Sequence, residues 1–168
     1  MPEKFEGPAY RQSITPTLTV KDAALAIDFY KKAFGAEEVM RMAGPGGKGI
    51  MHAELRIGDS AFFLSEEFAG MSEKSPQTLG GITGGTYLLV ADADAVFKRA
   101  VEAGAHAEMP VEDMFWGDRM GSIVDPSGHH WAIATHKEDI PPEELKKRSD
   151  EFFAKMGADS ECQVASSV

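Results

Sequence analysis

The chain has 168 residues, 43% of them hydrophobic and 26% charged, which is typical of one globular domain. Its formal net charge of −10 argues against capture of nucleic acid or an anionic membrane by clustered Lys and Arg side chains. The sequence shows no membrane-spanning apolar run and no signal segment, and its one cysteine, Cys162, excludes an internal disulfide or a cysteine-ligated metal. These features predict a cytoplasmic protein.

The first half of the chain begins with strict alternation in SITPTLTV, residues 13–20, which predicts a half-buried strand. Asp22 can then cap a helix that Gly35 ends. Further strands are expected at residues 37–42, 49–59 and 60–66, with a glycine-rich turn at 44–49. The resulting order is β-α-β-β-β.

The same pattern restarts after a linker at residues 67–85, whose GGITGG end is too rich in glycine for a helix or a central strand. TYLLVAD echoes TLTVKD, and Asp92 follows Asp22 by 70 residues. A helix ending at Gly104 and strands around 106–111, 121–124 and 129–136 complete the repeat. The sequence therefore predicts an α+β domain over residues 1–137, with βαβββ modules at 13–66 and 86–136.

Residues 138–168 form a separate carboxyl-terminal segment. Pro142 and the two glutamates after it favour a helix start, and Gly157 favours its end. An apolar stripe predicts docking on the domain or on a partner chain; it consists of Leu145, Phe152, Phe153 and Met156. Residues 158–168 are expected to be disordered.

Three segments carry a family resemblance: TPTLTVKDAALAIDFYKKAFGAEE, MHAELRIGDS and WGDRMGSIVDPSGHHWAIATH. In their order and spacing, over residues 12–137, they resemble the vicinal oxygen chelate superfamily of glyoxalase I, bleomycin-resistance proteins and extradiol dioxygenases, and its PhnB-like branch in particular. The resemblance implies a cup-shaped mixed sheet around a small-molecule ligand or a divalent metal. It also implies a homodimer, and leaves open whether the cup closes within one chain or between two.

Enzymes of that superfamily place metal ligands on the first and last strands of each module. The matching positions here are taken as Thr15, Phe63, Thr86 and Ala132. None offers the imidazole or carboxylate that a divalent ion prefers. The sequence therefore predicts that the usual metal site is absent and that no cofactor is bound.

His52, Glu54 and Arg56 share the polar face of one expected strand. If that face lines the cup, the imidazole and carboxylate can support acid–base chemistry and Arg56 can hold an anionic group. The alternative is a solvated strand face with local ion pairs.

The stretch DPSGHHWAIATH, residues 125–136, concentrates three of the five histidines. Trp131 and Ile133 are expected to pack against a helix, so that His130 and His136 face the cup and His129 lies at the strand entrance. The competing interpretation is that His129 and His136 only bond backbone or water. His130 is kept as a ligand-binding candidate.

Three further residues are candidates for the pocket wall. Phe63 is expected opposite the core residue Phe62, where it would make the cup apolar. In FWGDR, Trp116 can form an aromatic wall and Arg119 can contact an anion. The alternative for Trp116 is a loop residue that covers the core edge.

The expected function is that of a small-molecule-binding protein that sequesters its ligand without a metal. The alternative is a lyase, isomerase or dioxygenase that uses no metal or an atypical site built from His52, Glu54 and His130. A third possibility is an interaction module acting through the carboxyl-terminal helix.

Overall fold

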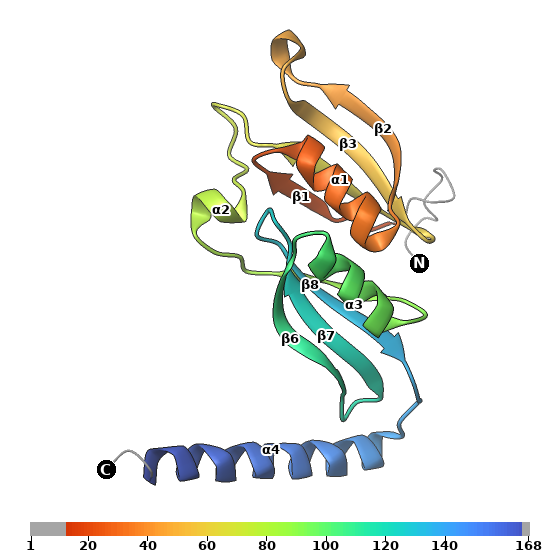
Figure 1. The fold of residues 1–168 in the computed structure, drawn as a ribbon, viewed down its shortest axis with the longest axis vertical. Coiled ribbons are helices and arrows are strands. Elements are labelled where there is room, and N and C mark those ends of the chain that lie inside the picture. The colour runs from red at the N-terminus through yellow and green to blue at the C-terminus, as the bar shows by residue number, and fades with distance from the viewer. Residues whose placement is uncertain (1–12, 166–168) are drawn as a thin grey trace.

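The computed structural model describes the backbone of residues 13–165 and the side chains of residues 13–156 (Figure 1). The first module contains β1 Thr17–Val20, α1 Ala23–Phe34, β2 Glu37–Ala43, β3 Ile50–Ile57 and β4 Ser60–Glu66. The second contains β5 Gly85–Leu89, α3 Ala93–Glu102, β6 His106–Asp113, β7 Asp118–Val124 and β8 His130–His136. The predicted α+β fold of two tandem βαβββ modules is confirmed.

Two shorter segments of helix lie in the connections. A 3-10 turn, η1, spans Pro45–Gly47 between β2 and β3. The linker between the modules contains one helical turn, α2 Pro76–Leu79, whose Ser75 side chain accepts a hydrogen bond from the Thr78 backbone N–H.

The strands form two four-stranded sheets, in the orders β1-β4-β3-β2 and β5-β8-β7-β6. Each sheet is mixed, because β1 with β4 and β5 with β8 pair in parallel while the other neighbours are antiparallel. Within the described residues no strand of one sheet pairs with the other sheet. The cup is therefore not closed by backbone hydrogen bonds in a single chain.

The helix starts repeat as the sequence predicts. The Asp22 carboxylate accepts a hydrogen bond from the Leu25 N–H at 2.9 Å, and Asp92 accepts one from the Ala95 N–H at 3.0 Å. Each satisfies an amide that the first helical turn leaves unpaired. Gly35 ends α1 in the left-handed conformation, with φ of 67°, which glycine adopts without steric cost.

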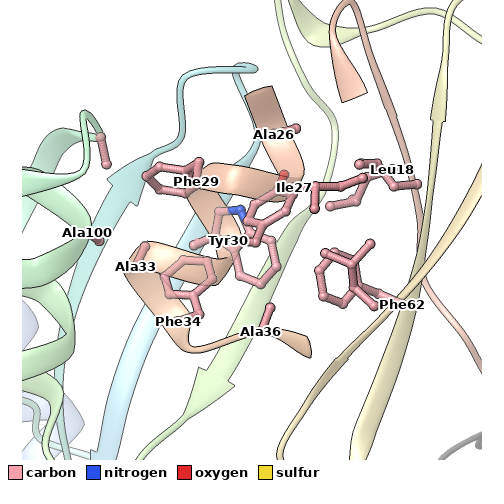
Figure 2. Packing of buried hydrophobic residues seen from close by; sticks show 14 of the residues in the cluster. Leu18, Ala26, Ile27, Phe29, Tyr30, Ala33, Phe34, Ala36, Phe62 and Ala100 are labelled. Atoms are coloured by element: carbon pink, nitrogen blue, oxygen red, sulfur yellow. The ribbon is translucent and has the colours of Figure 1, made fainter. Parts of the chain in front are cut away.

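The core lies between the helices and the sheets and joins the two modules. Figure 2 shows the α1 side chains Phe29, Tyr30 and Phe34 directed into this core, with Phe62 across from them. The Tyr30 and Phe62 ring centroids are 5.4 Å apart, and those of Phe34 and Trp131, on β8, are 4.7 Å apart. Helix α1 therefore packs on both modules rather than on its own sheet alone.

A buried carboxylate ties these aromatic residues to the loop before β8. Asp125 accepts hydrogen bonds from the Tyr30 hydroxyl at 2.7 Å and the Trp131 indole N–H at 3.0 Å. It also accepts from the backbone N–H groups of Ser127 at 2.8 Å and His129 at 3.0 Å. Its charge is thus compensated by four donors, two of them on side chains from different modules.

The carboxyl-terminal helix α4 spans Pro142–Ala165. The expectation that it ends at Gly157, with disorder from 158 on, is wrong, because one glycine costs a helix only about 1 kcal/mol relative to alanine; residues 166–168 lie outside the described residues. Its Phe152 ring lies 5.1 Å from Phe115, in the β6–β7 connection. Phe153 nevertheless remains 60% exposed, so the stripe is only partly covered.

Candidate functional site

Each sheet has one face covered by helices and one open face. In the first module, Leu18, Leu55 and Leu64 are buried on the covered side. The open face is defined by the strand positions that alternate with them, namely Thr17, His52, Glu54, Arg56 and Phe63, together with Met40 and Met42. In Figure 1, α1 and α3 lie on the same side of the two sheets, so both open faces are directed to the other side.

The open face of the first module brings together three of the predicted residues. His52 Nε2 lies 3.5 Å from Glu54 Oε1, and Glu54 is only 5% exposed. The His52 and Phe63 rings meet edge-on with centroids 4.9 Å apart. Their arrangement is an imidazole–carboxylate pair beside an aromatic wall, as the sequence predicts.

Arg56 is engaged elsewhere on the same sheet. Its guanidinium donates to Glu37, 2.5 Å away on β2, and to the Gly58 carbonyl at 2.9 Å. This is the local ion pairing that the sequence left as the alternative. The positive charge of Arg56 is therefore already balanced before any ligand arrives.

The open face of the second module has its own imidazole–carboxylate pair. His130 Nδ1 lies 3.3 Å from Glu108 Oε2, which also accepts a hydrogen bond from the Ser122 hydroxyl at 3.1 Å. A hollow of about 280 Å³ lies beside them, lined by Gly85, Thr86, Tyr87, Ser122, His130, Trp131 and Ala132. His130 thus lines a concave surface, as predicted. Sequence reasoning missed Glu108 and Ser122, because they are contributed by other strands.

A second polar group lies at the far end of this face. Asp118 accepts hydrogen bonds from the Tyr87 hydroxyl at 2.6 Å and from His136 Nδ1 at 2.9 Å, while His136 Nε2 lies 3.1 Å from Asp139. Bonds to Asp118 and Asp139 raise the pKa of His136. Burial acts to raise the pKa of Asp118, but its bonds with Tyr87 and His136 outweigh this and lower it. The sequence repeat could have identified Tyr87, because it follows Thr17 by 70 residues, the same spacing that separates Asp22 from Asp92.

These contacts predict how His136 titrates. Because a raised pKa means that the folded protein holds the proton more tightly, the contribution to stability is fully present below about pH 6.5 and is lost as pH rises through the folded pKa. In Asp118→Asn the negative charge is removed, so the His136 pKa should fall toward its ordinary value. An NMR titration of the imidazole measures this. Asp139→Asn serves as the comparison, and an unchanged His136 pKa in Asp118→Asn would contradict the assignment.

His129 lies at the entrance to β8 and is buried. Its backbone N–H donates to Asp125, and its Nε2 lies 3.0 Å from the Thr19 carbonyl. These are the backbone contacts that the sequence offered as the competing interpretation. His129 therefore connects β1 of the first module with the second module.

Arg119 does not lie with the other candidates. Its register partner is Thr135, and its guanidinium donates to Asp94, in the first turn of α3, at 2.7 and 2.8 Å, and to Asp113 at 3.1 Å. Alternation along β7 directs Asp118 to the open face and its neighbour Arg119 to the helix side. Trp116 lies just before β7, with its ring 5.0 Å from Phe115. Its side chain also interacts with Tyr87 and Asp118, so it belongs to the polar group at the far end of the second module's open face.

The register also corrects the positions compared with the family's metal ligands. Thr86 pairs with Trp131 on the covered side, and Tyr87, opposite Ala132, faces the open side. Thr15 precedes β1, and Thr17 is the residue opposite Phe63. Phe63 and Ala132 carry no ligand atom, so the corrected set does not fit a site built from imidazole and carboxylate. Among the side chains that the structure describes, no three His, Cys, Asp or Glu residues are grouped so that they could hold a metal ion.

A larger hollow of about 610 Å³ lies at the junction of the modules. The turn between β3 and β4, the outer edge of β5, and Trp131 line it, together with Ile14 and Pro16. It contains Asp59 but none of the histidine–carboxylate pairs. We therefore assign the candidate site to the open faces, where the groups capable of acid–base chemistry and of charge recognition lie.

No helix of the described residues is both long and apolar enough to cross a membrane.

The paired βαβββ modules, each with a mixed four-stranded sheet, define the class of fold to which the chain belongs. The family profile "Glyoxalase/Bleomycin resistance protein/Dioxygenase superfamily" matches residues 13–133. The chain therefore belongs to this superfamily. Helix α4 lies beyond the matched region.

Three similar proteins illustrate the range of the family. An uncharacterised protein of Mycobacterium bovis, Mb0911c, is 42% identical over 80% of this chain and 90% of its own length. A Mycobacterium bovis protein named as a putative glyoxylase, CFP32, is 31% identical over 76% of this chain and 46% of its own length. The crystal structure of TioX from Micromonospora sp. ML1 is 28% identical, with a TM-score of 0.59, over 74% of this chain and 98% of that one.

Proposed function

We propose that this protein binds a small organic molecule in a cup formed by the open faces of two copies of the chain, and sequesters it without a metal ion. The observation that carries the proposal is that both open faces bear polar and aromatic groups, yet no element among the described residues covers either of them. His52, Glu54 and Phe63 supply one wall, and His130 and Tyr87 supply the other.

The need for a second copy is inferred from the packing on the opposite side. Helices α1 and α3 contact each other, and the Arg99 guanidinium of α3 donates to the Ala33 carbonyl of α1 at 3.1 and 3.2 Å. Since the covered sides meet in this way, the two open faces of one chain do not enclose a common space. Met42, Tyr87 and Leu89 are left 51%, 47% and 62% exposed on these faces. Such apolar exposure is typical of a surface that a partner or ligand covers.

Metal-free binding is supported by the side chains at the positions where a metal would be held. Phe63 and Ala132 lie at central strand positions where the family's enzymes place ligands, and neither side chain can coordinate an ion. Their effect is to make the floor of the cup apolar, which suits the aromatic or aliphatic part of an organic ligand.

An enzyme is the second candidate, because histidine–carboxylate pairs are also the groups that move protons in catalysis. It would use His52 with Glu54 and, from the other wall, His130, either alone or as an atypical metal site. The name of the relative CFP32, putative glyoxylase, favours this candidate.

Native mass spectrometry of the full chain, combined with elemental analysis, tests the proposal. We expect a dimer at micromolar concentration and, in protein purified from its source, a retained organic ligand at up to one molecule per cup. Stoichiometric zinc, nickel, manganese or iron would contradict metal-free binding. A monomer that binds nothing would contradict the shared cup, whereas turnover of the retained compound would favour the enzyme.

A further inference from the structure

The charges on the open faces are unevenly distributed. Lysine is absent from all of the described strands, and arginine occurs there only as Arg41, Arg56 and Arg119. Arg119 lies on the helix side, and Arg56 is neutralised by Glu37. Arg41 pairs in register with the buried Ala53 and bonds Glu38. No strand arginine is therefore available to hold an anion in the cup.

Carboxylates, in contrast, recur on both open faces, and three of them lie next to a histidine. The pairs are Glu54 with His52 at 3.5 Å, Glu108 with His130 at 3.3 Å and Asp118 with His136 at 2.9 Å. A pair with a neutral imidazole has a charge of −1, and a pair with an imidazolium has a charge of 0. The faces can thus be negative or neutral, but these pairs do not make them positive.

Lys74, the cation closest to this region in the linker, does not change that balance. It lines a hollow beside Thr17 and Thr19, at the outer edge of β1. There it acts on Glu67, whose carboxylate also bonds Ser75 and Thr78. None of the three histidine–carboxylate pairs lines that hollow.

The apolar part of the faces is suited to a flat group. The Phe63 and Tyr87 rings face the open side, and aromatic faces attract cations through their quadrupoles. Met40 and Met42 lie opposite Glu54 and His52, and methionine adapts its shape to an irregular partner.

Building on the proposed function, we propose that the cup selects an organic cation, a flat apolar molecule with an amine or ammonium group, over an anion of the same size. Carboxylates raise the local concentration of cations and repel anions, and a charge placed against a like charge in a water-poor cup is costly. The ammonium group would lie against Glu54 or Glu108 and the flat part against Phe63 and Tyr87.

Three dansyl probes that differ mainly in charge test this selectivity. Dansylcadaverine is a cation, dansylamide is neutral and dansylglycine is an anion, and their fluorescence reports binding to the full-length protein. We expect the cation to bind about tenfold or more tightly than the anion, which corresponds to one unfavourable charge contact.

Charge-removing variants locate the effect. Glu54→Gln and Glu108→Gln keep the side-chain shape and should each weaken dansylcadaverine binding at least about threefold more than dansylamide binding. Glu37→Gln releases Arg56 from its ion pair and should strengthen dansylglycine binding. Glu102→Gln, on the exposed side of α3, is the matched control and should change none of the three. Circular dichroism confirms that each variant is folded.

The possible outcomes separate this inference from the proposed function. Equal binding of the three probes, or a preference for dansylglycine, would overturn the charge selectivity and leave ligand binding in place. A cation preference that survives both Glu54→Gln and Glu108→Gln would also overturn it. If none of the probes binds, both the selectivity and the proposed cup are contradicted.

Discussion

Replacing Asp125 by alanine is expected to lower the free energy of unfolding by about 3–5 kcal/mol, because several buried donors would lose their acceptor and each unsatisfied donor costs about 1–3 kcal/mol. The carboxylate is 4% exposed and accepts hydrogen bonds from Tyr30, Trp131, Ser127 and His129. Without it, four donors lose their acceptor in a region where water cannot reach all of them. Urea denaturation followed by circular dichroism measures the change.

Two variants show whether the loss comes from the network. Tyr30→Phe removes one donor and keeps the ring, so a cost of about 1.5–3 kcal/mol is expected for one hydrogen bond to a charged group. Asp59→Ala removes an exposed carboxylate from the β3–β4 turn and should change stability by no more than about 0.5 kcal/mol. If Asp125→Ala costs no more than Asp59→Ala, the buried carboxylate is not the link between the modules.

The repeat could be predicted because its signals are local. Asp22 and Asp92 cap helices within three residues of themselves, and alternation along a strand needs no knowledge of its neighbours. The same reasoning correctly separated Phe62 from Phe63 and Trp131 from His130. The helices and strands, and the side of the sheet that each residue faces, could therefore be predicted from the sequence wherever the ends of a strand were clear.

The predicted faces were wrong where it was uncertain at which residue a strand starts or which of two alternating sets of residues faces the helices. Strand β7 begins at Asp118 rather than at the expected Gly121, so alternation could not be applied to Arg119. Thr86 was compared with the wrong face because a shift of one residue exchanges the two sides of a strand. The first mistake is a difference of three residues in the start of β7, and the second is a shift of one residue in β5.

The contacts between strands could not be predicted at all. Glu108 meets His130, and Tyr87 meets Asp118, because the sheet order is β5-β8-β7-β6. This order depends on long-range pairing rather than on local pattern. The ion pair of Arg56 with Glu37 is of the same kind, and it balances the positive charge that was expected to hold an anionic group. A cytoplasmic location and the homodimer stay predictions.

Replacement of Trp131 by alanine should be as damaging as loss of Asp125. The indole is 2% exposed, and its ring lies within 6 Å of the rings of Tyr30, Phe34 and Phe62, which belong to the other module. Deleting a large buried aromatic side chain typically costs about 3–5 kcal/mol, because lost burial and the remaining cavity add together. Denaturation with guanidinium chloride gives the magnitude.

The second tryptophan provides a matched control for this change. Trp116 lies in the partly exposed β6–β7 connection, so Trp116→Ala should cost less than about 2 kcal/mol, within the usual range for a substitution outside the core. Trp131→Phe should fall between the two, since it keeps a ring but loses the indole N–H that donates to Asp125.

Hydrogen exchange then distinguishes a local defect from a loss of coupling between the modules. Because the Trp131 side chain belongs to the second module while three of its aromatic neighbours belong to the first, amides of α1 should exchange faster in Trp131→Ala although α1 itself is unchanged. Faster exchange confined to β8 and β7 would mean that the modules fold independently. In that case the relative placement of the two open faces, on which the shared cup depends, would not be fixed by this core.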